Sequence, residues 1–287
     1  MLNNGLGGEF MNNTKKLQKM RNIITVFVIL LSAICCIVPI ITNKELTQTT
    51  MISTFGEEIN LYGKGVYGHN SFSMAIQAIS QDIVTLILIL PCMIASLCFV
   101  RKGKAIAEYI LTGLIGYMLY TYMSYSFLMF YNILFLFYVV LMALSFYGFI
   151  LSIQILSQHY SVEKLQENLK TKGIRIFLNI TGIFIAMMWL GRIFPTIVSD
   201  TLPVGLDNYS TLVIQALDLG VIVPACFVIS HLLKIKNRLG FILGPVIIIK
   251  GVALVIAVLT MAFCMMAFGI EVAPVEYVVF GIICVLV

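Results

Sequence analysis

The chain has 287 residues, of which 60% are hydrophobic and only 11% are charged, with a net charge of +5 and a mean hydropathy of +1.02. Soluble domains carry about a quarter of their residues as charges, so this composition excludes a soluble globular protein and indicates one surrounded by lipid. The seven cysteines all lie inside apolar runs and the three histidines are scattered. Neither residue type has the spacing of a disulfide framework or a metal site, and we expect no cofactor.

Residues 1–22 form a predicted cytoplasmic tail that is polar and ends in a basic cluster. Residues 1–10 look like the product of an upstream start or of cloning and are left out of the fold prediction. The apolar run at 23–41 has two interpretations, a cleaved signal peptide or a retained first span. The run is longer than a typical signal core and lacks a small-x-small exit, which favours a retained span.

Seven more apolar runs follow, at about 83–100, 109–130, 133–155, 176–198, 209–233, 241–268 and 274–287. A helix needs about 20 residues to cross the ~30 Å hydrocarbon layer, and all but the last run reach or nearly reach that length. The 14 residues of the last run suggest a short final span or a truncated chain. Continuous apolar runs without period-two alternation exclude a β-barrel. The predicted fold is an all-α, polytopic membrane helix bundle of eight transmembrane helices.

The basic residues predict the orientation of these helices. With the N-terminus in the cytoplasm, 14 of the 18 Lys and Arg residues, Arg21 among them, fall in cytoplasmic segments. Lys44 and Lys64 fall outside, and Arg192 and Lys250 fall within spans. This skew follows the positive-inside rule and places both termini in the cytoplasm. It also assigns the positive charge to topology and lipid headgroups, with no nucleic acid as a partner.

Two stretches of similar pattern predict an internal repeat. Each contains an Asn, a Gln seven residues later, an Asp, a Pro and a basic residue ten positions after the proline: Asn70, Gln77, Asp82, Pro91 and Arg101, then Asn208, Gln215, Asp218, Pro224 and Lys234. Four helices per copy preserve orientation, so the repeat is a parallel 4+4 arrangement. The copies are 23–156, with an external segment at 42–81, and 176–287, joined by a cytoplasmic connection at 157–175.

Charged residues inside the spans are the first candidate site residues. Asp218 and Lys250 each lie nine residues into a span. A rise of 1.5 Å per residue places both roughly 13 Å deep, near the midplane. An ion pair between them is predicted, because a charge at this depth needs a partner or a wet cavity. Arg192 and Asp82, both near outer span ends, form a second candidate pair, although both could instead snorkel to the interface.

The run at 109–130 adds a polar stripe at helical spacing, consisting of Tyr117, Tyr120, Thr121 and Ser124. Two interpretations remain open for it: hydrogen bonding between helices, or an outward-opening polar cavity between the two halves. The complete candidate binding site comprises Asp218, Lys250, Arg192, Asp82, Gln215, Tyr117, Tyr120 and Ser124.

Four segments together resemble an uncharacterised family of bacterial multipass membrane proteins. They are QDIVTLILILP (81–91), the tyrosine-rich region at 116–139, WLGRIFP (189–195) and VIQALDLGVIVP (213–224). The resemblance covers most of the chain from about residue 60. It brings no activity that could be carried over, and it implies location in the bacterial cytoplasmic membrane.

The leading functional hypothesis is a transporter of a small molecule or an ion, including a proton-coupled permease, with its polar site between the two halves. The alternative is a non-enzymatic membrane sensor or assembly scaffold that uses segment 42–81 as its recognition surface. An enzyme is the least favoured class, because no nucleophile–base pair, metal cluster or cofactor motif is present in the sequence.

Overall fold

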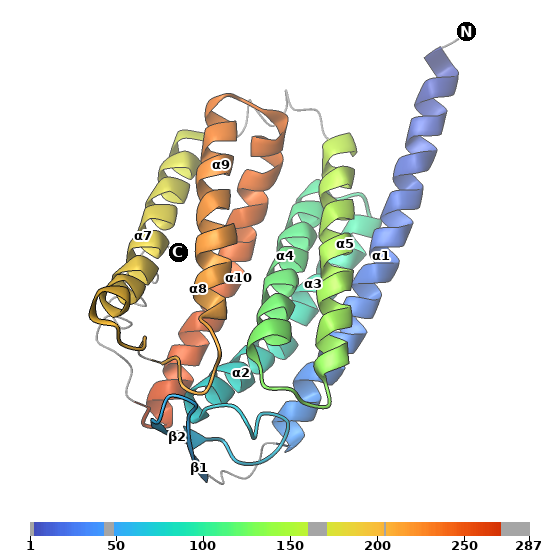
Figure 1. The fold of residues 1–287 in the computed structure, drawn as a ribbon. Helices are drawn as coiled ribbons and strands as arrows, with labels where there is room; N and C mark the ends of the chain where they lie inside the picture. Colours follow the sequence, from blue (N-terminus) through green and yellow to red (C-terminus); the bar gives the residue numbers. More distant parts are fainter. Residues whose placement is uncertain (1–2, 43–48, 160–170, 204, 271–287) are drawn as a thin grey trace.

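The computed structural model describes residues 3–42, 49–159, 171–203 and 205–270, and most of them are helical (Figure 1). The helices are α1 (Asn3–Thr42), α2 (Phe72–Val84), η1 (Thr85–Ile89), α3 (Leu90–Arg101), α4 (Ala105–Leu128), α5 (Phe135–His159), α7 (Thr171–Ser199), α8 (Val213–Leu217), η2 (Asp218–Ile222), α9 (Val223–Lys234) and α10 (Arg238–Ala267). Strands β1 (Thr49–Ile52) and β2 (Glu58–Leu61) form an antiparallel hairpin in which Thr49 faces Leu61.

Six helical stretches in the described residues are long and apolar enough to cross a membrane: Asn13–Thr42, Phe72–Arg101, Phe135–Gln158, Thr171–Ser199, Val213–Lys234 and Arg238–Ala267. Helix α4, with 24 residues, is long enough as well, but its many tyrosines make it less apolar. The predicted all-α membrane bundle is confirmed. The predicted count of eight spans is not, since six such stretches are found and the run at 274–287 lies outside the described residues.

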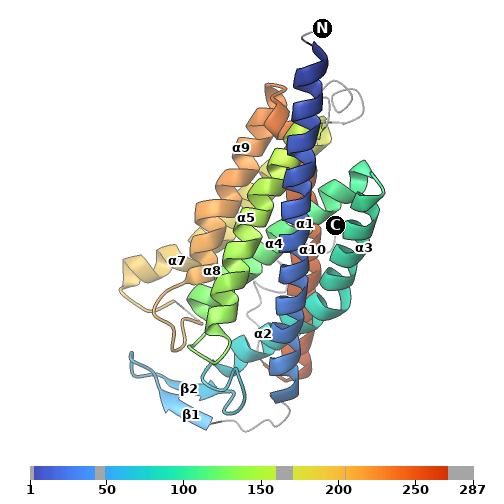
Figure 2. The ribbon, with the colours of Figure 1, turned by 90° about the vertical axis from the view of Figure 1, so that its right-hand side faces the viewer.

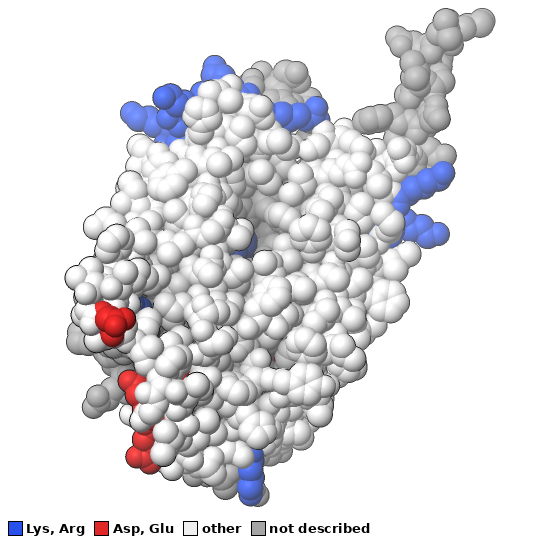
Figure 3. Space-filling model, in the orientation of Figure 1, with Lys and Arg blue, Asp and Glu red and all other residues white. Residues whose placement is uncertain are grey.

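The two ends of the bundle differ in charge. The start of α1, the α3–α4 turn and the α9–α10 turn lie at one end, and the β1–β2 hairpin lies at the other (Figure 1, Figure 2). Lys and Arg gather mainly at the first end and Asp and Glu toward the second (Figure 3). We call these the basic end and the hairpin end. Their separation is the distribution that the positive-inside rule requires.

Helix α10 contributes to all three packed cores of the described residues. The largest core contains residues of helices α1 through α5 together with Ala253 and Ala257 of α10. A second core joins α7 and α9 to α10 through Leu178, Cys226 and Phe241. A third core joins Leu156 of α5 to Ile242 and Val246 of α10. Helix α4 packs against α3, α5 and α10. The two halves of the chain therefore meet mainly where α10 packs against α4 and α2.

Two spans contain a five-residue π-helical segment, η1 and η2, at corresponding positions. Each is followed by a 12-residue α-helix whose second residue is proline, Pro91 or Pro224. Proline lacks an N–H and crowds the carbonyl four residues earlier, so a wider π-turn before it relieves the clash. Three successive helix starts in the two regions are displaced by 133 residues (85 to 218, 90 to 223, 105 to 238), whereas the preceding helices, α2 and α8, start 141 residues apart.

The first predicted span is part of a longer helix. Residues 1–22 were predicted to be a cytoplasmic tail, and within them α1 is helical from Asn3 and continues without a break to Thr42. Asn13–Thr42 is long enough for a span that starts earlier than predicted. The polar residues before position 23 therefore lie on a continuous helix, and one face of that helix is covered by the bundle.

Candidate functional site

Asp218 lies where three elements meet. It is the first residue of η2 and only 9% exposed. Its Oδ1 accepts a 2.7 Å hydrogen bond from the Tyr120 hydroxyl of α4, and its Oδ2 accepts one of 2.8 Å from Trp189 Nε1 of α7. The N–H of Val223 bonds to the Asp218 carbonyl, which is the i+5 bond of the π-turn. Both carboxylate oxygens are thus satisfied inside an otherwise apolar span, which reduces the cost of burying the group.

Lys250 does not form the predicted direct ion pair with Asp218. Its ammonium group lies over the Tyr120 ring, 4.1 Å from the centroid, and the residue is 8% exposed. The face of an aromatic ring attracts a cation, and the attraction strengthens where water is excluded. Tyr120 therefore lies between the two charges: its hydroxyl bonds to the acid and its ring contacts the base. The structure brings Asp218 and Lys250 into one cluster through this tyrosine.

A glycine sets the close approach of α4 and α10 beside this cluster. A Cβ added to Gly113 would lie 2.6 Å from Ile249 Cγ2 and 3.1 Å from the Val246 carbonyl oxygen. Ile249 directly precedes Lys250, and Tyr120 lies two helical turns beyond Gly113 on the same face of α4. The absence of a side chain at Gly113 thus allows Lys250 to reach Tyr120.

Gly113→Ala is expected to lower the free energy of unfolding by about 1–3 kcal/mol, because the new methyl group meets Ile249 and backbone with little room to move. Unfolding by SDS in detergent micelles measures the change. Gly251→Ala is the matched control, since its added Cβ meets no atom within 4 Å and alanine favours a helix. Equal stability of the two variants would contradict the close α4–α10 contact.

Asp82 forms a second cluster, at the hairpin end of the bundle. It is 2% exposed, and its two oxygens accept hydrogen bonds from the hydroxyls of Tyr67 (2.7 Å) and Tyr125 (3.1 Å). Tyr67 belongs to the segment before α2, and burial together with the nearby Asp82 charge raises the pKa of its hydroxyl well above the usual value. The rings of Tyr122 and Tyr138 pack around Tyr125. The predicted Asp82–Arg192 pair does not form, because Asp82 is enclosed by tyrosines of the first half.

Arg192 is instead associated with Trp189. Its guanidinium carbon lies 6.0 Å from the centre of the Trp189 ring, on the same helix α7. Gly205, in the loop after α7, has a φ of +74°, and a Cβ there would lie 2.7 Å from an Arg192 terminal nitrogen. Trp189 in turn donates to Asp218. Arg192 is therefore one contact removed from Asp218 and not part of its immediate shell.

The remaining predicted residues separate into two groups. Gln81 Nε2 donates to both the Tyr117 hydroxyl and Thr121 Oγ1, at 2.8 Å each, so this part of the stripe bonds α4 to α2. Ser124 donates to the Thr121 carbonyl within α4. Gln215 is buried in α8, one turn before Asp218. Of the predicted stripe, the structure places Tyr120 beside Asp218 and Lys250, whereas Tyr117 bonds to α2 and Ser124 bonds within α4.

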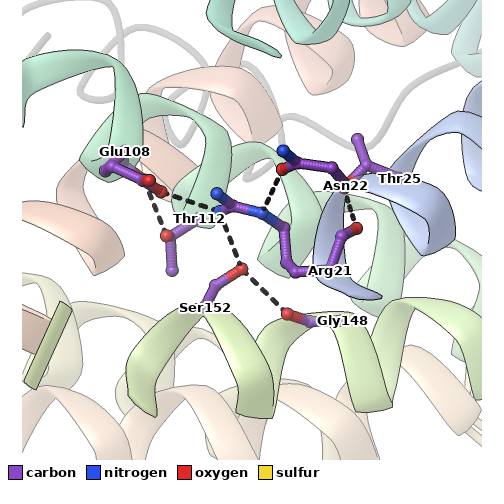
Figure 4. Close-up of polar contacts among 7 residues, drawn as sticks. All are labelled: Arg21, Asn22, Thr25, Glu108, Thr112, Gly148 and Ser152. Carbon is purple, nitrogen blue, oxygen red and sulfur yellow. Dashed lines mark hydrogen bonds and ion pairs between the residues drawn. The ribbon is translucent and has the colours of Figure 1, made fainter. Parts of the chain in front are cut away.

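A third cluster was not predicted at all (Figure 4). Arg21 of α1 pairs with Glu108 of α4, with 2.8 Å between Nη1 and Oε2, and the two side chains are 0% and 4% exposed. Arg21 Nη1 also donates to Ser152 Oγ of α5 at 3.4 Å, and its Nε donates to Asn22 Oδ1. Arg21 was predicted only as a basic residue of a cytoplasmic segment and not as a site residue. The residue lies in the bundle because α1 starts earlier and turns this face toward α4 and α5.

Two sequence signals could have found the missed residues. The polar residues Arg21, Thr25 and Ser32 recur at helical spacing in the sequence, and the structure shows that their face of α1 is buried. Trp189 is the single tryptophan of the chain, and a tryptophan in a span needs an acceptor for its indole N–H. Trp189 and Tyr120 are the partners of Asp218 that the geometry identifies.

Within the described residues, no group of three His, Cys, Asp or Glu side chains is placed to hold a metal ion. Comparisons with family models, curated proteins and solved structures return no match for the chain. The resemblance to a bacterial multipass family therefore rests on the sequence segments alone.

Proposed function

We propose that the protein is a membrane transporter for a small molecule or an ion, with Asp218, Tyr120, Trp189 and Lys250 as its binding site. One observation carries the proposal: a buried acid and a buried base contact the same tyrosine within the apolar part of the bundle. Charges at this depth are costly and are typical of substrate or ion pathways. A cationic or protonated substrate would compete with Tyr120 and Trp189 for the carboxylate.

The surface of the bundle supports access to this site. Figure 3 shows a hollow on one face, between the α8–α9 side and the α4–α5 side, with basic side-chain atoms at its floor. The four site residues come from α4, α7, η2 and α10, which adjoin this region. A solute entering between the two halves would meet Lys250 and Asp218.

The finer proposal is a parallel 4+4 repeat of eight spans, with its basic end in the cytoplasm of a bacterial cell. The paired π-segments and the displacement of 133 residues that three helix starts share support it. The two asparagines of the predicted repeat are 138 residues apart and do not follow this displacement, but their regions meet at the hairpin end: Asn208 Nδ2 donates to the His69 carbonyl, and the Tyr209 hydroxyl donates to Asn70 Oδ1. The displacement pairs Asp218 with Thr85, so only the second copy carries the acid at this position.

The flux of solute through the reconstituted protein tests the transport proposal. A ligand-stabilisation screen selects the solute, because a ligand that binds the folded state raises apparent stability. Proteoliposomes then measure uptake of that solute, or of protons. Asp218→Asn keeps the size of the side chain but removes its charge, and we expect flux to fall at least about tenfold, the effect of losing roughly 1.4 kcal/mol of binding.

Asp200→Asn is the matched control for this measurement. Asp200 is exposed in the loop after α7 with a φ of 52°, a conformation that asparagine tolerates. Its variant should transport like the unmodified protein. Equal flux in the Asp218→Asn and unmodified proteins would overturn the proposed site.

A second candidate function is recognition of an assembly partner at the hairpin end. The β1–β2 hairpin exposes Ile52 (74%) and Phe55 (47%) beside the acids Glu57 and Glu58. Such a combination of exposed apolar and charged groups is typical of interaction surfaces. The same flux measurement separates the two functions. If the protein is a sensor or scaffold, neither the unmodified protein nor the Asp218→Asn variant should take up the solute.

A further inference from the structure

A groove of about 580 Å³ lies at the basic end, between the start of α1 and the end of α3. Its polar part is lined by Lys15, Lys19 and Arg101. Its apolar part is lined by Ile23 and Phe27, which are 49% and 53% exposed, together with Val26 and Val100. The groove is thus cationic at one end and apolar at the other.

We propose that this groove binds one anionic phospholipid, with its phosphate among Lys15, Lys19 and Arg101 and an acyl chain along Ile23, Val26 and Phe27. The site is separate from the Asp218 cluster and does not rest on the transport proposal.

The order of residues along α1 matches the order of groups in a phospholipid. Lys15, Lys19, Ile23 and Phe27 follow one another at four-residue spacing, so they occupy one face of the helix. The eight helical steps from Lys19 to Phe27 rise about 12 Å at 1.5 Å per residue, enough to pass from the headgroup layer into the hydrocarbon. The sequence changes from cationic to apolar in this direction, which is the polarity gradient of the lipid.

The charge of the groove selects an anion. None of the residues that line it is acidic, and its three cations form no ion pair with any described residue. Arg21, on the same helix, faces the bundle and is neutralised by Glu108. The cations of the groove are therefore available to bind an anionic ligand. Each basic group near a membrane surface adds about 1 kcal/mol to the binding of an anionic lipid.

The volume of the groove distinguishes it from an ordinary lipid-facing helix surface. Arg101 ends α3, which approaches α1 at the basic end, so cations from two helices border the same space. A phosphate between them contacts both helices at once. The zwitterionic lipid phosphatidylcholine leaves the excess positive charge uncompensated and should bind more weakly.

Lipid titration of the purified protein in a neutral detergent tests the proposal. Short-chain phosphatidylglycerol is the probe, phosphatidylcholine is the zwitterionic comparison, and native mass spectrometry counts bound lipid. The variant Lys15→Gln, Lys19→Gln, Arg101→Gln should bind phosphatidylglycerol at least tenfold more weakly, since each lost cation contributes about a fivefold factor. The charge-conserving variant Lys15→Arg, Lys19→Arg, Arg101→Lys should retain binding within about threefold, because it keeps the three charges.

A second set of three exposed cations at the same end provides the matched control: Lys16→Gln, Lys102→Gln, Lys104→Gln. It removes equal charge but leaves the groove lining intact, so binding should weaken by less than about threefold, because exposed charges outside the groove are screened by solvent and salt. Equal losses in the two Gln variants would overturn the proposal in favour of diffuse attraction. Phosphatidylcholine binding as tightly as phosphatidylglycerol would overturn it as well.

The apolar half of the site is tested by Val26→Trp, which fills the groove at the level of the acyl chain. Phosphatidylglycerol binding should fall at least fivefold in this variant, while circular dichroism shows the helices unchanged. Glycerol phosphate, which has the headgroup without the chains, should compete poorly with the lipid. Competition by glycerol phosphate at the same concentration as the lipid would show a soluble phosphate ligand and contradict a lipid site.

Discussion

Glu108→Leu is expected to lower the free energy of unfolding by about 3–5 kcal/mol, the largest effect among the substitutions considered. The variant leaves the Arg21 guanidinium fully buried without its counter-ion, and an uncompensated buried charge costs several kcal/mol. Arg21→Met should cost a similar amount by leaving the carboxylate alone. Unfolding by SDS in detergent micelles, at fixed lipid content, measures both variants.

The double variant Arg21→Met, Glu108→Leu is the decisive control. Replacing both partners of a buried ion pair by apolar residues is often neutral, because the desolvation penalty disappears together with the attraction. We expect its stability to lie within about 1 kcal/mol of the unmodified protein, which gives a large coupling energy in the mutant cycle. Single variants as stable as the unmodified protein would show that the two side chains are not paired in the bundle.

The Arg21–Glu108 pair and the Gly113 contact lie along one helix and join different neighbours. Glu108 is in the first turn of α4, where it connects to α1 and, through Arg21, to Ser152 of α5. Gly113 follows five residues later and is the point of close contact with α10. Helix α4 is therefore fixed to the first half at its start and meets the second half in its middle. This places Tyr120 on a rigid element between the halves.

The architecture was predictable because lipid leaves few choices. An apolar run of about 20 residues must satisfy its backbone internally and is therefore a helix, whatever its neighbours are. The spans around Pro91 and Pro224 followed from this argument. Their π-segments did not, because a proline in a span indicates a kink but does not specify which turn widens.

The partners of the buried charges could not be predicted in the same way. The depth of Asp218 and Lys250 follows from residue count, but their contacts depend on how the helices are rotated and how closely they approach. Gly113 allows α10 so near to α4 that Lys250 reaches the ring of Tyr120. The rise per residue of a helix gives the depth of a side chain but not the rotation of the helix about its axis. For the same reason, the sequence did not show that the face of α1 carrying Arg21 packs against α4 and α5.

Asp82→Ala is expected to lower the free energy of unfolding by about 2–4 kcal/mol. It removes the acceptor of the Tyr67 hydroxyl, which is fully buried, and a buried donor left without a partner costs about 1–3 kcal/mol. The lost side-chain atoms leave a small cavity that adds to this cost. Tyr125 is affected less, because its hydroxyl also lies 3.1 Å from the Ala78 carbonyl.

Asp82→Asn separates the hydrogen bonds from the charge. The amide oxygen still accepts one bond, so the loss should stay below about 1.5 kcal/mol. Tyr67→Phe removes the donor from the other side, and the Asp82→Ala, Tyr67→Phe double variant should lose less than the sum of the two single variants. Because Tyr67 anchors the segment between β2 and α2, Asp82→Ala should also speed protease cleavage there, at the hairpin end. Additive losses with unchanged cleavage would mean that Tyr67 and Asp82 are not coupled, and that Asp82 stabilises the bundle through α4 alone.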